Sequence, residues 1–141
     1  MNDPEVRRTS WQQDHTELRR IRERVFIAEQ AVPPELEWDA EDAHAIHFLA
    51  FEGEFAVGTA RLLADGHIGR VAVLRDWRHQ GIGLSLMQAA LQQARQLHLP
   101  RAILSAQTQA IPFYQRLGFQ VTSGEYLDAG MPHVEMQCLL S

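Results

Sequence analysis

A short glycine turn, Arg78-His-Gln-Gly-Ile-Gly83, constrains the fold of this chain more than any other feature. The apolar run before it, HIGRVAVL, predicts a strand over 67–74. Residues at helical spacing after it predict a helix that Pro100 ends, namely Leu84, Met87, Leu91, Ala94 and His98.

A helix that starts directly after a strand leaves several backbone N–H groups without partners, and its dipole adds about half a positive charge there. Glycine lets a phosphate reach such amides, and Arg78 could add a charged contact. The turn therefore predicts a pyrophosphate site. Two glycines can equally serve close packing of the helix on the sheet, and that alternative stays open.

The first half of the chain alternates between helical and strand periodicity. Asp14-x-x-Glu17 has the spacing of a capping box, and the apolar pattern after it predicts a helix over about His15–Gln30. After an acidic loop, AIHFLAFE and FAVGTARLL predict an antiparallel hairpin of strands at 45–52 and 55–63.

The second half continues this alternation. RAILSAQ predicts a strand over 101–107, and Pro112 predicts a short helix that begins within 108–111 and stops at Gly118. Two final strands are predicted at roughly Phe119–Tyr126 and His133–Leu139, joined by a loop with Gly130 and Pro132. This order of elements predicts one domain over 1–141 of the α/β class, with an α+β-type central mixed sheet flanked by helices.

Charge and cysteine content exclude several classes of protein. The formal net charge is −5, so binding to nucleic acid or to an anionic membrane is not expected. Cys138 is the only cysteine, which excludes an intrachain disulfide and a zinc cage. The segment MNDPEVRRTS lacks the apolar core of a signal peptide, and no apolar stretch approaches the length of a membrane span. We expect a cytoplasmic protein.

The histidines do not predict a metal site. His44 and His47 are an odd number apart beside a predicted strand, so they should point to opposite faces. The chain has no HxxxH pair and no cysteine cluster.

Three segments together resemble the GNAT N-acetyltransferase superfamily. VAVLRDWRHQGIGLSLM is similar to its acetyl-CoA motif, Arg/Gln-x-x-Gly-x-Gly/Ala after a strand, here with Arg78, Gly81 and Gly83. AQTQAIPFYQRLGF is similar to its later motif, a short helix with a tyrosine that leads into Gly-Phe. YLDAGMPHVEM and VFIAEQAVPPELEWDAED resemble the bacterial ElaA-like branch, and the likeness runs from about Leu18 onward.

The resemblance implies a GNAT-like acyl-CoA N-acyltransferase fold with acetyl-CoA as cosubstrate. In that fold the strand before the glycine turn splays from the next parallel strand, and the pantetheine arm pairs with it, here at Val71, Ala72 and Val73. The resemblance places the pyrophosphate on the amides of His79, Gln80, Gly81, Ile82, Gly83 and Leu84. An amine would then attack the thioester directly, while a backbone N–H near Val73 stabilises the oxyanion.

Tyr114 occupies the family position of the general acid that protonates the departing thiolate. A phenol suits this step because its reference pKa, about 10, lies near that of an alkyl thiol. The alternative is a packing aromatic, since Phe113 and Leu117 form an apolar i,i+4 pair beside it.

The acceptor side is predicted from an acidic loop that contains Glu35, Glu37, Asp39, Glu41 and Asp42. In this superfamily that loop borders the acceptor entrance, where a cationic amine would suit it, although acidic loops are often only solvated surface. Candidates for binding the acceptor and for the general base are Glu37, Asp39 and His133, in no order. Arg61 and Arg70 lie on predicted strands and must find carboxylates or an edge, or else support the acceptor pocket or a subunit contact.

The sequence thus predicts an acetyl-CoA-dependent N-acetyltransferase for a small-molecule or protein amine. One alternative is a noncatalytic acyl-CoA-binding or sensor module, which Tyr114 disfavours. Another is a structural subunit in which the glycine turn only packs. A homodimer is compatible with the family.

Overall fold

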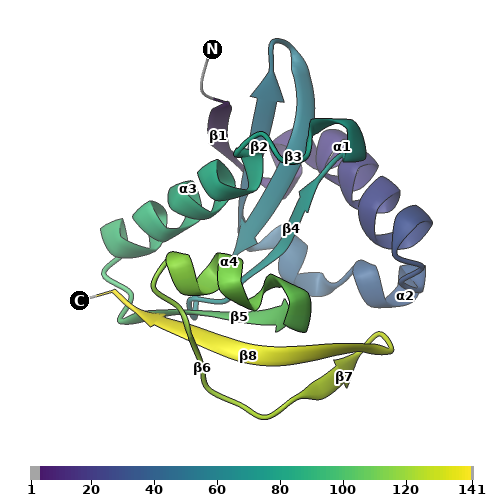
Figure 1. The fold of residues 1–141 in the computed structure, drawn as a ribbon. Coiled ribbons are helices and arrows are strands. Elements are labelled where there is room, and N and C mark those ends of the chain that lie inside the picture. Colours follow the sequence, from purple (N-terminus) through teal and green to yellow (C-terminus); the bar gives the residue numbers. More distant parts are fainter. Residues whose placement is uncertain (1–3, 141) are drawn as a thin grey trace.

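The computed structural model describes residues 4–140, which form two four-stranded sheets (Figure 1). The first sheet has the order β1 (Glu5–Thr9), β2 (Ile46–Glu52), β3 (Phe55–Leu62), β4 (Ile68–Val73). The second has the order β5 (Arg101–Gln107), β8 (Met131–Leu139), β6 (Gln120–Val121), and β7 (Tyr126–Asp128) also pairs with β8. Strand pairing within each sheet is antiparallel, and one parallel bridge, His67 to Ile103, joins the two sheets.

The helical segments surround these sheets. The longer ones are α1 (Trp11–Arg22), the π-helical segment η1 (Glu23–Glu29) and α3 (Ile82–Gln96). The shorter ones are α2 (Pro34–Glu37), η2 (Ala40–Ala43), η3 (Arg75–Trp77), η4 (Thr108–Ala110) and α4 (Ile111–Arg116).

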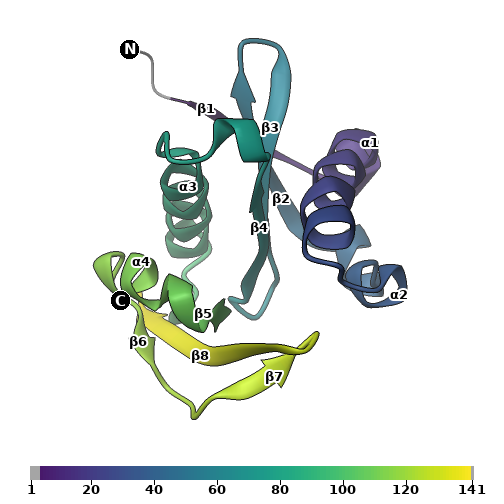
Figure 2. The same ribbon diagram turned by 45° about the vertical axis from the view of Figure 1, so that its right-hand side comes forward.

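Helices α1 and α3 cover opposite faces of the first sheet (Figure 2). On one face Leu18 and Ile21 of α1 pack against Leu49 in a small apolar cluster. On the other face α3 packs in a larger cluster that also includes Leu104 and Met136 of the second sheet. The core on the α3 side therefore continues from one sheet into the other.

The predicted fold class is confirmed, since antiparallel sheets flanked by helices meet through a parallel bridge. The hairpin at 45–63, the strand at 67–74 and the strand at 101–107 all form within one residue of their predicted bounds. The short helix also forms as predicted, with 3₁₀ and α parts, and Gly118 follows its end with a φ of 99°. The short-range periodicity of the sequence was sufficient to predict the type and bounds of these elements.

The first helix begins four residues before the predicted start at His15, and a kink at Asp14 separates this added turn from the predicted helical run. The helix begins at Trp11, and Ser10 caps it by accepting a hydrogen bond from Gln13 N at 3.2 Å. Asp14 instead has non-helical angles, φ −132° and ψ 26°, and its carboxylate accepts from Thr9 Oγ1. Both residue types are good N-caps, and the upstream serine took that role. The predicted end near Gln30 holds, although its last turns are π-helical.

The predicted tail is partly wrong. One strand was expected at 119–126, but the chain leaves the ladder after Val121 and pairs again at Tyr126. Ser123 explains the break, because its hydroxyl accepts from Glu135 N at 2.8 Å in place of a backbone carbonyl. The expected loop is a tight turn at Ala129-Gly130, both with positive φ, and Pro132 lies inside β8 opposite Leu127.

Candidate active site

A cavity of about 460 Å³ lies where the two sheets separate. Within residues 4–140, β4 and β5 share no strand pairing beyond the His67–Ile103 bridge. The cavity is lined by Val71 of β4, by Leu104 and Gln107 of β5, and by Tyr114 of α4. Residues of η1, α2 and the β7–β8 turn complete its walls. The predicted splay between these two strands thus encloses a real space.

The edge of β4 that faces away from β3 pairs with no other strand in the described part of the chain, although Val73 O on this edge accepts a hydrogen bond from Arg78 Nε. Leu74 N–H donates to Val57 O of β3 at 2.9 Å, so by the alternation of a strand the backbone groups of Val73 and Val71 point the other way. Ala72, by contrast, pairs with Thr59 of β3 and is 3% exposed. Of the three strand residues predicted to hold pantetheine, Val71 and Val73 present backbone groups on the open edge.

The glycine turn has the geometry of an anion site. A Cβ atom built on Gly81 or on Gly83 meets no protein atom within 4 Å. The N–H groups of residues 79–84 donate no hydrogen bond to any acceptor in the described part of the chain. The amides at the start of α3 are therefore available, and the space in front of them is open.

The open space removes the packing explanation for these two glycines. Close packing of α3 on the sheet falls to Gly58 of β3, where a Cβ would lie 3.0 Å from Leu86 Cδ1 and 3.2 Å from Ile82 Cγ2. Gly81 is needed for its φ of 82°, but Gly83 has ordinary helical geometry. Neither fold nor packing requires glycine at position 83, whereas an approaching ligand would.

Arg78 connects the glycine turn to two other elements. Its Nε donates to Val73 O at 2.8 Å, and its Nη1 and Nη2 contact the Glu29 carboxylate at 2.6 and 2.8 Å. The hydrogen bond between Arg78 and Glu29 lowers the pKa of the Glu29 carboxyl and raises the pKa of Arg78. Each of the three guanidinium nitrogens thus has a protein partner, and one N–H on Nη1 and one on Nη2 remain for the pyrophosphate contact that the sequence predicted.

Tyr114 lies on α4 and is half-buried at the cavity wall. Its ring makes edge contacts with Phe113, at a centroid distance of 5.1 Å, and with Phe119, at 6.0 Å. Burial raises the pKa of Tyr114, so the phenol keeps its proton at neutral pH. The ring therefore packs against other aromatic residues, as the alternative role of a packing aromatic predicted, and Tyr114 also lines the cavity.

Two of the three acceptor-side candidates line the cavity, Glu37 and His133, whereas Asp39 does not. Burial raises the pKa of Glu37, although Arg70 and Arg22 act in the opposite direction. His133 Nδ1–H donates to Met131 O at 2.8 Å, since a carbonyl can only accept. In the neutral imidazole, this bond places the proton on Nδ1 and the lone pair on Nε2.

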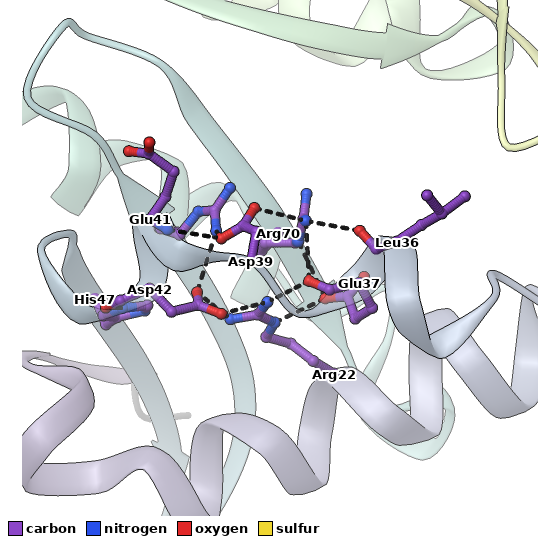
Figure 3. Close-up of polar contacts among 9 residues, drawn as sticks. Arg22, Leu36, Glu37, Asp39, Glu41, Asp42, His47 and Arg70 are labelled. Atoms are coloured by element: carbon purple, nitrogen blue, oxygen red, sulfur yellow. Dashed lines mark hydrogen bonds and ion pairs between the residues drawn. The ribbon is translucent and has the colours of Figure 1, made fainter.

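The acidic loop is held by a buried network of ion pairs (Figure 3). Arg22 of α1 is 0% exposed and binds Glu37 Oε2 at 2.8 Å and Asp42 Oδ1 at 2.7 Å. On the strand side, Arg61 Nη1 binds Asp39 at 2.8 Å, and Arg70 Nη2 binds the other oxygen of Asp39 at 3.2 Å.

These ion pairs show that the acidic loop is largely neutralised by arginines. Its carboxylates at 37, 39 and 42 pair with the arginines at 22, 61 and 70, so they do not form a free negative surface. Arg61 and Arg70 find carboxylates, as their strand positions required. The sequence interpretation missed Arg22, although a signal existed. Arg22 lies on the apolar face of the helix with Leu18, Ile21 and Val25, where a charged side chain needs a buried partner.

The splayed sheets, the free edge of β4 and the open amides of the glycine turn together define the acyl-CoA N-acyltransferase class of fold. A family model described as an acetyltransferase (GNAT) domain matches residues 10–140. This chain belongs to the GNAT acetyltransferase family.

Relatives and solved structures agree with this assignment. The uncharacterized N-acetyltransferase YjcF of Bacillus subtilis is 41% identical over 120 residues, covering 82% of this chain and 86% of the relative. A crystal structure of an acyl-CoA N-acyltransferase from Pseudomonas aeruginosa is 30% identical with a TM-score of 0.87, over 96% of this chain and 99% of that one. Escherichia coli ElaA is 27% identical with a TM-score of 0.85, over the same shares.

The predicted GNAT and ElaA-like resemblance is confirmed, and so is the prediction of an acetyltransferase enzyme. As a member of this family the chain transfers an acyl group from acyl-CoA to an amine. Among residues 4–140, no helix is both long and apolar enough to cross a membrane.

Proposed function

We propose that this enzyme transfers the acetyl group of acetyl-CoA to a primary amine by direct attack within a ternary complex. The observation that carries the proposal is the glycine turn, whose unpaired amides face open space at Gly81 and Gly83. Those amides would hold the pyrophosphate, aided by the dipole of the 15-residue helix α3. The pantetheine arm would then run along the open edge of β4, at Val71 and Val73, into the cavity.

The cavity supplies groups for each proton that must move. The amine nitrogen attacks the thioester carbonyl, and the N–H of Val73 is our candidate donor to the oxyanion. In its neutral form His133, whose Nδ1–H bonds Met131 O, would take the proton from the amine at Nε2, directly or through water. When the C–S bond breaks, the Tyr114 phenol would donate its proton to the thiolate. Glu37 is a second candidate base, whereas both Asp39 oxygens are already paired with arginines.

These groups favour an enzyme over the alternative of a binding or sensor module. A module that only bound acyl-CoA would need the glycine turn and the strand edge, but neither a buried phenol nor an oriented imidazole beside them. The structural-subunit alternative predicts no affinity for CoA at all.

Calorimetric titration with acetyl-CoA tests the proposal on wild type and on Gly83→Trp. Because position 83 has ordinary helical geometry and open space around it, we expect the variant to fold with nearly unchanged Tm. The indole would cover the amides, so we expect affinity to fall by about tenfold or more, which is roughly 1.4 kcal/mol.

The matched control is Gln92→Trp, an exposed position nine residues further along the same helix. It lies about 13 Å along the axis and on the opposite side, so binding should stay as in wild type. No saturable binding by folded wild-type protein would contradict the acetyl-CoA assignment. Equal binding by Gly83→Trp would move the pyrophosphate away from this turn.

A further inference from the structure

Arg61 and Arg70 belong to the cavity wall and come from neighbouring strands. The pairing of β3 with β4 places Arg70 and Val71 opposite the single residue Ala60, which is a β-bulge. Arg70 has a φ of 52°, a left-handed conformation that is strained for a residue with a side chain. Bulges commonly redirect side chains beside active sites. The strained bulge therefore suggests that the direction of the Arg70 side chain serves a function.

The three arginines of the network differ in how fully the protein satisfies them. Arg22 is completely buried, and each of its three nitrogens donates to Glu37 or Asp42. Arg61 uses only Nη1, and its Nε is buried without an acceptor in the described chain. Two further atoms, Arg61 Nη2 and Arg70 Nη1, donate to no protein acceptor within residues 4–140. Neither atom is fully buried.

These spare donors belong to two guanidinium groups that share one carboxylate partner. Arg61 Nη1 and Arg70 Nη2 hold the two oxygens of the same carboxylate, Asp39, at 2.8 and 3.2 Å. The two guanidinium groups are therefore neighbours, and both also line the cavity. Arginine presents N–H groups in a planar fork that matches a carboxylate. Arg22 is structural by comparison, since it does not line the cavity and each of its three nitrogens already donates to Glu37 or Asp42.

The negative groups of the same cavity complement this arrangement. Glu37 Oε2 accepts a hydrogen bond from Arg22 and lies 3.1 Å from Arg70 Nε in an ion pair, while Oε1 has no protein donor among the described residues. Asp128 is exposed at the β7–β8 end of the cavity. A ligand with an amine at one end and a carboxylate at the other meets both kinds of group.

We propose that the acceptor is an amine that also carries a carboxylate, and that Arg61 and Arg70 bind this carboxylate through Arg61 Nη2 and Arg70 Nη1. The inference rests on the proposed acetyl transfer and names the substrate class of the same cavity. It replaces the purely cationic acceptor that the acidic loop suggested, because both oxygens of Asp39 and of Asp42 are already paired with arginines, and Glu37 alone of these three keeps one oxygen without a donor among the described residues.

Matched acceptors test this proposal. Initial rates of CoA release are measured for amino acids and for the corresponding primary amides, over several separations of amine and carboxylate, beginning with glycine, β-alanine and 4-aminobutanoate. A hydrogen-bonded charge pair commonly contributes enough for a tenfold preference, so we expect kcat/KM for the best acid to exceed that of its amide by about tenfold or more. Aminoalkyl phosphonates of equal length distinguish a carboxylate site from a general anion site.

The variant Arg70→Gln separates recognition from structure. We expect kcat/KM for the acid to fall to the level of the amide, while the rate with the amide stays nearly constant, and Arg70→Lys should recover part of the preference. Arg95→Gln, an exposed arginine on α3 outside the cavity, is the matched control and should change neither rate. Equal loss with acid and amide in Arg70→Gln would assign Arg70 a merely structural role.

Three further outcomes would overturn the proposal. These are equal wild-type rates with acids and amides, a preference for phosphonates over carboxylates, and acetyl-CoA binding without transfer to any member of the series. Failure of the proposed function is distinguishable, because it appears in the titration as absence of acetyl-CoA binding before any acceptor is added.

Discussion

Tyr114 and His133 reach the cavity from different elements, α4 and β8, and the Tyr114 hydroxyl and His133 Nε2 have no hydrogen-bond partner among residues 4–140. If both move protons, Tyr114→Phe and His133→Gln should each lower kcat by about a hundredfold or more, within the usual range for general acid–base catalysis. Acetyl-CoA affinity, measured by titration, should change by less than about threefold, because neither polar group is proposed to hold the cofactor.

Tyr126→Phe is the control for this pair. It removes a hydroxyl that bonds Ser105 and keeps the ring that stacks on His133 at 6.2 Å, so kcat should stay near wild type. Unchanged turnover in Tyr114→Phe would remove the phenol from the mechanism, and the same result for His133→Gln would leave Glu37 as the base to test.

Single residues were predictable where their chemistry is independent of distant partners. Tyr114, His133 and Glu37 could be named as candidates from residue type and position, and the structure places all three around one cavity. The roles of Asp39 and Arg78 were not accessible in the same way. Their partners lie far along the chain, 31 residues from Asp39 to Arg70 and 49 from Glu29 to Arg78. Only folding brings these charges together.

At the scale of elements, the Arg78–Glu29 pair joins η1 to the end of β4 and to the glycine turn. If the pair acts as a brace, Glu29→Gln and Arg78→Gln should each weaken acetyl-CoA binding roughly three- to tenfold, with the larger effect for Arg78→Gln because it also removes the hydrogen bond to Val73 O. The double variant should add little to Arg78→Gln, because both single changes remove the same ion pair. Both partners are partly exposed, so Tm should change little.

Titration of the four proteins with acetyl-CoA measures this cycle, and Arg75→Gln is the control. Arg75 is more exposed and lies 3.8 Å from the same carboxylate, so its loss should have little effect. The competing role, a direct contact of Arg78 with pyrophosphate, predicts a severe loss in Arg78→Gln with none in Glu29→Gln. That pattern would refute the brace.

Elements with strong periodicity were predicted well, and the errors fall where side chains replace backbone partners. Ser10 and Asp14 are both good caps, and sequence alone does not rank them once Thr9 offers Asp14 a hydrogen bond. Ser123 ends β6 by taking a bond that a ladder carbonyl would otherwise accept. Such local competition depends on the register of the sheet, which is a tertiary property.

At the scale of the whole molecule, the two sheets are connected by one parallel bridge and by the shared core under α3. The family motifs predicted the splay between β4 and β5, but not all the side chains that line the cavity between them. Arg61, Arg70 and the β7–β8 turn line part of this cavity, and their positions depend on contacts between distant segments.

A ligand that spans the glycine turn and the cavity should stabilise this divided molecule as a whole. Acetyl-CoA at 100 times its Kd adds about 2.7 kcal/mol to the free energy of unfolding, which for a domain of this size raises Tm by roughly 8 °C. Thermal unfolding followed by circular dichroism measures this shift. Pantetheine, which lacks the pyrophosphate, should give a much smaller shift at equal concentration. Gly83→Trp should keep the unliganded Tm and lose most of the response to acetyl-CoA. An equal shift with pantetheine, or a full shift in Gly83→Trp, would mean that the free amides of α3 contribute little to binding.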